Sequence, residues 1–156
     1  MKFNHLIQIN DPLLPLVDAL TRNQLWQGLV LRAQEPALFV PYLDGCTISA
    51  VSGTGFTRTL RYGDLEILDL VTLTPEHTVL YAIPEQKDIA PSSLTMTIEE
   101  PQPDLFFVRF AYEDTHAEAA GSVDAFYNEF RLSAYEEADI DTIRLIRQMA
   151  QEGKLG

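Results

Sequence analysis

The chain has 156 residues, a hydrophobic fraction of 46% and a formal net charge of −12, which suits one soluble globular domain. This acidic balance argues against nucleic acid and against an anionic membrane surface as partners, because both are bound through clustered Lys and Arg side chains. No apolar run approaches the roughly 20 residues that span a bilayer, no signal peptide is recognisable, and the single Cys46 cannot form an intrachain disulfide, so we expect a cytoplasmic protein.

The first predicted element is a half-buried strand over residues 2–9, where apolar side chains and His5 alternate with polar ones. Thr21 then has the features of a helix N-cap, and Gln24 three residues later completes a capping box. The helix that follows should end before Pro36, because a residue that precedes proline is pushed out of the helical region.

Five or six strands are predicted next, at intervals of about ten residues with turn signals between them, which is typical of an antiparallel meander. They span approximately Cys46–Val51, Phe56–Tyr62, Leu65–Leu73, Thr78–Ile83, Leu94–Glu99 and Leu105–Glu113. The clearest turn is Gly63-Asp64, a two-residue loop that suits a type II′ hairpin.

This turn sets the register of its hairpin and places Arg58 opposite Asp69 on an otherwise apolar face. The apolar members of that face are Phe56, Leu60, Tyr62, Leu65, Ile67, Val71 and Leu73. Burying either charge alone would be costly, so we expect the two to pair. Two interpretations stay open: an internal ion pair that orders the sheet, or an anchor for a polar group of a ligand.

Alternation places further large side chains on inward faces of the later strands. These are Val79, Tyr81, Ile83, Leu94, Met96, Ile98, Phe106, Val108, Phe110 and Tyr112. Tyr81 and Tyr112 carry hydroxyls that need partners when they are buried, which makes them better candidates for a pocket than the phenylalanines.

The last predicted element is a long helix over residues 122–152, with Ser122 as its N-cap. One apolar stripe of this helix consists of Val123, Phe126, Tyr127, Phe130, Ala134 and Ala138. Beyond residue 138 the same side becomes polar. Either the helix overhangs or bends there, or Glu137 and Arg144 line a polar end of a cavity.

A meander followed by one long helix must bury both apolar faces on each other. We therefore predict an α+β fold in a single domain, residues 1–156, in which a curved antiparallel sheet wraps around a long C-terminal helix. A pocket between sheet and helix is expected. The residues predicted to line it are Arg58, Asp69, Tyr81, Met96, Phe110, Tyr112, Phe126, Tyr127 and Phe130.

The sequence contains no phosphate-binding glycine loop, no nucleophile elbow and no Cys/His set with metal-ligand spacing. We therefore assign no cofactor, no metal and no catalytic residue. His5 is interpreted as a hydrogen-bonded core histidine, with an acid–base role as the alternative.

Three stretches resemble the AtaL-like subgroup of the START-like, or SRPBCC, superfamily. They are Leu25-Trp26-Gln27-Gly28-Leu29, residues 93–100 and residues 138–144. The resemblance implies the helix-grip fold over essentially the whole chain. It also implies a superfamily that includes polyketide cyclases and aromatases, lipid and sterol carriers, plant hormone receptors and co-chaperones.

The leading hypothesis is a protein that binds a small hydrophobic molecule, lipid-like or polyketide-like, between sheet and helix. A first alternative is a cyclase or aromatase in which Arg58, Asp69, Tyr81 or His5 transfers protons. A second is a co-chaperone-like interaction module with an exposed apolar patch. The identity of the ligand and the oligomeric state do not follow from the sequence.

Overall fold

The computed structural model describes residues 1–13, 19–115 and 123–156, with the backbone alone for residues 123–128. The elements in chain order are β1 (Lys2–Gln8), α1 (Arg22–Gln34), the 3-10 helix η1 (Pro36–Leu38), β2 (Gly45–Ser49), β3 (Gly55–Tyr62), β4 (Leu65–Thr74), β5 (Thr78–Ile83), β6 (Ser92–Gln102), β7 (Leu105–Asp114) and α2 (Val123–Gln151).

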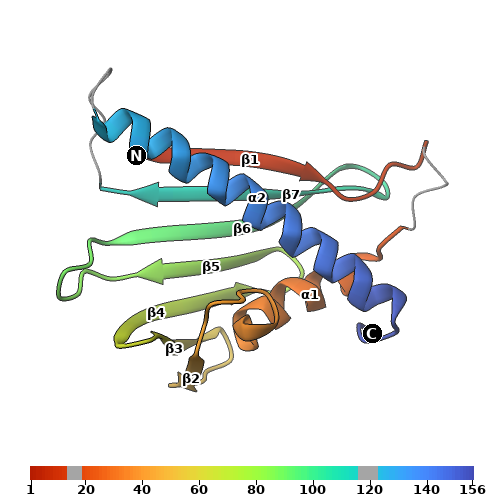
Figure 1. Ribbon diagram of the computed structural model, residues 1–156. Coiled ribbons are helices and arrows are strands. Elements are labelled where there is room, and N and C mark those ends of the chain that lie inside the picture. Colours follow the sequence, from red (N-terminus) through yellow and green to blue (C-terminus); the bar gives the residue numbers. More distant parts are fainter. Residues whose placement is uncertain (14–18, 116–122) are drawn as a thin grey trace.

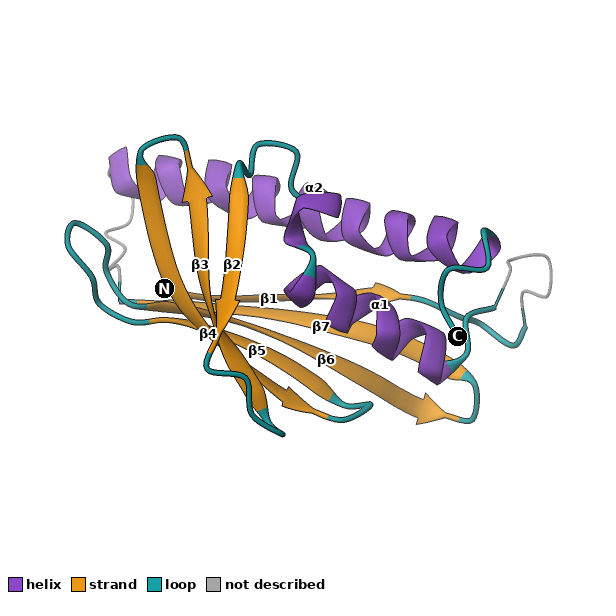
Figure 2. Cartoon of the chain, turned by 90° about the horizontal axis from the view of Figure 1, so that it is seen from below, coloured by secondary structure: helices purple, strands orange, loops and turns teal. Residues whose placement is uncertain are grey.

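The strands form one seven-stranded sheet in the order β1-β7-β6-β5-β4-β3-β2. Each neighbouring pair is antiparallel. β1 forms one edge of the sheet, next to β7, the last strand of the meander. Both helices lie over the same face of the sheet, and α2 crosses its strands from one side to the other (Figure 1). In Figure 2, β2 and β3 rise from the plane of the other strands toward α2, so the sheet curves around the helices. The predicted α+β architecture is confirmed.

Local sequence signals explain where several elements begin and turn. The Thr21 side chain accepts a hydrogen bond from the backbone of Gln24, and the Gln24 side chain accepts one from the backbone of Thr21, both at 3.0 Å. This is the predicted capping box. Gly63 has a positive φ of 60°, as the first position of a type II′ turn requires. The hairpin consequently has the predicted register, with Arg58 opposite Asp69.

Some element boundaries differ from the prediction. Strand β2 ends at Ser49, not at Val51, because Ala50 adopts a positive φ of 48° that leaves the strand conformation. Strand β6 continues to Gln102 through an irregularity in its pairing with β7, and a bulge of this kind allows Pro101 within a strand. The N-cap predicted at residue 122 lies outside the described residues.

The inward faces of the strands follow the predicted alternation. Val79, Met96, Val108 and Phe110 have fully buried side chains at the centre of the core. Leu65 was expected on the same face but is 50% exposed, because it directly follows the turn at the end of its hairpin.

The buried face of α2 corrects the predicted stripe. Phe130 is 70% exposed, and Ala134, Ala138, Glu137 and Arg144 are exposed as well. Among residues 129–151 of this helix, the buried ones are Asp139, Thr142, Ile143 and Ile146. The second half of the stripe is therefore wrong, because the polar Asp139 belongs to the buried side, with its carboxylate against partners on β1 and β7. The side chains of Val123, Phe126 and Tyr127 lie outside the described residues.

Candidate functional site

A cavity of about 310 Å³ lies between the sheet and the two helices, and we call it the sheet–helix cavity. The residues that line it are Arg32, Arg58, Leu60, Tyr62, Asp69, Tyr81, Ile83, Ser92, Ser93, Leu94, Tyr112, Glu113, Asp114 and Tyr135. They come from β3 to β7 and from one position on each helix. The volume falls at the lower end of the range of roughly 300–1,000 Å³ for sites that hold small molecules.

Four of the predicted site residues meet in this cavity: Arg58, Asp69, Tyr81 and Tyr112. Met96 and Phe110 are fully buried in the core and do not contribute to its lining. The side chains of Phe126 and Tyr127 lie outside the described residues. Phe130, which is 70% exposed, is not among the lining residues.

Arg58 and Asp69 form a buried bidentate ion pair on β3 and β4. The Nε and Nη2 atoms of Arg58 donate to the two carboxylate oxygens of Asp69 at 2.9 Å and 2.6 Å. The Nη1 atom donates to the carbonyl of Ala33, in the last turn of α1, at 3.0 Å. Burial lowers the pKa of Arg58, but Asp69 raises that pKa by more, so the guanidinium stays charged. The pair therefore joins the end of α1 to the sheet.

Tyr81 lies beside two guanidinium groups at the centre of the cavity wall. The Cζ atoms of Arg58 and Arg32 lie 4.7 Å and 5.2 Å from the centroid of its ring, close enough for cation–π attraction. Within the described residues, the buried Tyr81 hydroxyl and the buried Nε of Arg32 have no hydrogen-bond partner. Burial lowers the pKa of Arg32, but Tyr81, Tyr112 and the Asp139 carboxyl group together raise it by more, which keeps the cation charged.

Tyr112, which lines the cavity, is the first member of a hydrogen-bonded chain that continues to Asp139 and His5, neither of which lines it. The Tyr112 hydroxyl donates to the two oxygens of Asp139 at 2.7 Å and 2.8 Å, and His5 Nε2 lies 2.7 Å from Asp139 Oδ2. Burial raises the pKa of the Asp139 carboxyl, and its two hydrogen-bond partners offset only part of that effect. Burial and the nearby carboxyl also raise the pKa of Tyr112, so its phenol stays protonated.

Aromatic rings form much of the remaining wall. The Tyr112 ring stacks on Tyr135 with centroids 4.1 Å apart and planes 7° apart, and burial raises the pKa of the nearby Tyr62. Flat walls, two guanidinium groups and several hydroxyls suit a planar, mostly apolar molecule that carries an oxygen.

The sequence analysis missed Arg32, Tyr62 and Tyr135 as lining residues. A signal for Arg32 was available, because it lies three residues after the fully buried Leu29 and therefore on the inner face of α1. Tyr135 had the corresponding signal only once Asp139, four residues later, was known to face inward.

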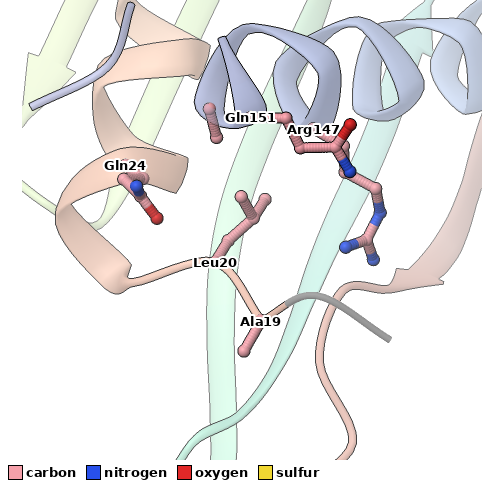
Figure 3. A pocket seen from close by; sticks show the side chains of 6 residues that line it. Ala19, Leu20, Gln24, Arg147 and Gln151 are labelled. Atoms are coloured by element: carbon pink, nitrogen blue, oxygen red, sulfur yellow. The ribbon is translucent and has the colours of Figure 1, made fainter. Parts of the chain in front are cut away.

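A second cavity of about 430 Å³ lies between the start of α1 and the end of α2 (Figure 3). It is lined by Ala19, Leu20, Gln24, Arg147, Ala150 and Gln151. Arg147 donates a hydrogen bond to the carbonyl of Ile9. Residues 14–18, which directly precede this lining, are not described, so we assign no function to the cavity.

Within residues 1–13, 19–115 and 123–156, no group of three or more His, Cys, Asp or Glu side chains could hold a metal ion. In the same part of the chain, neither helix combines the length and the apolar character that crossing a membrane requires.

The curved antiparallel sheet, the long C-terminal helix and the cavity between them define a protein with the helix-grip fold. More narrowly, the chain belongs to the AtaL family, described as acetylaranotin biosynthesis cluster protein L, whose model matches residues 7–153. No curated protein sequence matches the chain.

Several solved structures have a similar fold. The di-domain ARO/CYC BexL superposes with a TM-score of 0.68 at 14% identity, over 95% of this chain and 49% of that one. The Zhui aromatase/cyclase from a Streptomyces species gives 0.65 at 12% identity, over 96% and 95%. The Aha1 dimer from Colwellia psychrerythraea gives 0.56 at 18% identity, over 100% and 99%. The chain spans about half the length of the two di-domain ARO/CYC proteins that it matches.

Proposed function

We propose that this protein binds a small, largely apolar molecule in the sheet–helix cavity. The observation that carries the proposal is the lining itself, in which the aromatic walls of Tyr81, Tyr112 and Tyr135 surround a cavity of about 310 Å³. Small-molecule sites combine aromatic and aliphatic surface with placed polar groups, and here the tyrosines, Leu60, Ile83 and Leu94 stand beside charged side chains and two serines.

The comparisons support a polyketide-like occupant. Similar structures carry the names ARO/CYC and aromatase/cyclase. Molecules of that class are flat or become flat, carry several oxygens and are otherwise apolar. Such a molecule matches aromatic walls that are interrupted by hydroxyl groups.

Native mass spectrometry of the protein isolated from its natural host tests the proposal. We expect a co-purifying small molecule on the wild-type chain. The matched test is Leu94→Trp, which fills the cavity from its β6 wall, against Leu70→Trp, which adds the same ring at a 45% exposed position on β4. Loss of the molecule in Leu94→Trp alone supports the cavity as its site. Equal retention in both folded variants contradicts the proposal.

A second candidate function, cyclisation or aromatisation of a polyketide-like chain, is favoured by one observation. The Tyr112 hydroxyl is held by Asp139, and Asp139 is in turn held by His5. A positioned phenol backed by a carboxyl group can act as a general acid or base toward a carbonyl compound in the cavity. Arg58 and Asp69 are less suited to that role, because they already bind each other through two hydrogen bonds.

Tyr112→Phe tests this second function, because it keeps the ring that stacks on Tyr135 and removes only the hydroxyl. We expect turnover of a poly-β-ketone substrate to fall by roughly 10²-fold or more, the scale of general acid–base catalysis, while substrate binding persists. Unchanged turnover in Tyr112→Phe would remove this tyrosine from the mechanism.

A further inference from the structure

Arg32 is the cation of the sheet–helix cavity that has no carboxylate partner within the described residues. It is half-buried and lines the cavity from the last turn of α1. Its Nε is buried without a hydrogen bond within the described residues, and its Cζ lies 5.2 Å from the centroid of the Tyr81 ring. A buried guanidinium normally pairs with an acid, because leaving its charge uncompensated is costly.

The acidic side chains that line or adjoin the cavity in the described part of the chain have partners other than Arg32. Both oxygens of Asp69 accept from Arg58, and both oxygens of Asp139 accept from Tyr112 while one also contacts His5. At the rim, Asp114 pairs with Arg131 at 2.7 Å, and Glu113 lies 3.7 Å from Lys2. None of these carboxylates forms an ion pair with Arg32.

Two features of the fold also favour a cation at this position, but neither replaces an anion. The C-terminal end of α1 attracts positive charge, and the Tyr81 ring attracts it through its π face. Neither offers two parallel acceptor oxygens, which is the arrangement that the planar donor fork of an arginine matches best.

We propose that the ligand of this cavity is a planar, mostly apolar carboxylic acid whose carboxylate pairs with Arg32 while its flat body lies against the tyrosine walls. The inference rests on the proposed function and adds the chemical class of the ligand. It explains why a chain with a formal charge of −12 has an arginine in its cavity that forms no ion pair within the described residues.

Two probes that share one ring system test the inference: 2-naphthoate, which is anionic at pH 7, and 2-naphthamide, which is neutral. Their affinities are measured by calorimetry on the wild type, on Arg32→Gln, and on Arg22→Gln as the control. Arg22 lies on the same helix and pairs with Glu100 rather than lining the cavity. We expect the wild type and Arg22→Gln to bind naphthoate about tenfold more tightly than naphthamide, a difference of about 1.4 kcal/mol. In Arg32→Gln the two affinities should become equal.

The possible results separate the inference from the function beneath it. Binding of both probes with no preference for naphthoate, or with a preference that survives in Arg32→Gln, overturns the inference and leaves the binding function standing. Binding of neither probe by the wild type counts against both. If Arg32→Gln does not fold, the wild type still decides: the naphthoate preference must disappear as the pH falls below about 4, where the probe's carboxylate is protonated, and a preference that persists there overturns the inference.

Discussion

The Arg58–Asp69 pair gives the sharpest stability prediction for a single residue. In Asp69→Asn, the guanidinium of Arg58 stays buried, at 6% side-chain exposure, without its counter-charge. Removing one partner of a buried pair costs about 3–5 kcal/mol, so we expect a loss of about that size in the free energy of unfolding, measured with urea. The matched control is Glu99→Gln, which breaks an exposed pair with Arg109 and should cost less than about 1 kcal/mol. Equal losses in the two variants would contradict the structural role assigned to the buried pair.

Asp139 predicts a pH dependence with a definite sign. Its pKa in the folded protein is raised by burial above the value of about 3.9 in an unfolded chain. The folded state therefore binds this proton more tightly than the unfolded state does. The resulting contribution to the free energy of unfolding is complete below about pH 4 and is lost as the pH rises through the raised pKa. We expect the free energy of unfolding of the wild type, minus that of Asp139→Asn, to decrease from about pH 4 upward. A difference that increases with pH would show that the pKa of Asp139 is lowered instead.

The contact between α1 and α2 depends on one glycine. A Cβ atom at Gly28 would lie 2.6 Å from Cγ2 and 2.8 Å from Cγ1 of Ile146, and a β-branched side chain in a helix has little freedom to move away. We expect Gly28→Ala to lose about 1–3 kcal/mol in a urea titration, although alanine is the better helix former.

Two further variants isolate this contact. Gly53→Ala, where a Cβ would have no neighbour within 4 Å, should change stability by less than about 0.5 kcal/mol. In an Ile146→Ala background the penalty of Gly28→Ala should disappear, because the clashing atoms are gone. A penalty that persists in that background would place its origin elsewhere than at the helix–helix contact.

The strands could be predicted from the sequence more completely than the long helix α2. The strands were predictable because each alternates along its own length, and the Gly63 turn sets the register that brings Arg58 to Asp69. The inner face of α2 was not, because within the described residues it includes the buried Asp139, whose hydrogen-bond partners Tyr112 and His5 come from distant parts of the chain. A pattern of apolar residues along one helix carries no information about such partners.

The whole molecule is a sheet curved around two helices, and two clusters of internal polar groups lie at the sheet–helix cavity between them. Outside the cavity, the core includes fully buried residues such as Met96 and Phe110. The cavity adjoins the Arg58–Asp69 pair and the Tyr112–Asp139 contact. Both internal polar clusters thus lie where strands and helices meet around the proposed ligand site.

The measurement that tests the binding site most directly is a titration of the isotopically labelled protein with 2-naphthoate, followed by amide NMR. We expect the largest shifts on residues whose side chains line the sheet–helix cavity, above all Arg32, Tyr81 and Leu94. The exposed outer-face residues Leu68 and Leu70 should remain unaffected. Shifts concentrated on that outer face, or no saturable shifts at all, would contradict binding in the sheet–helix cavity.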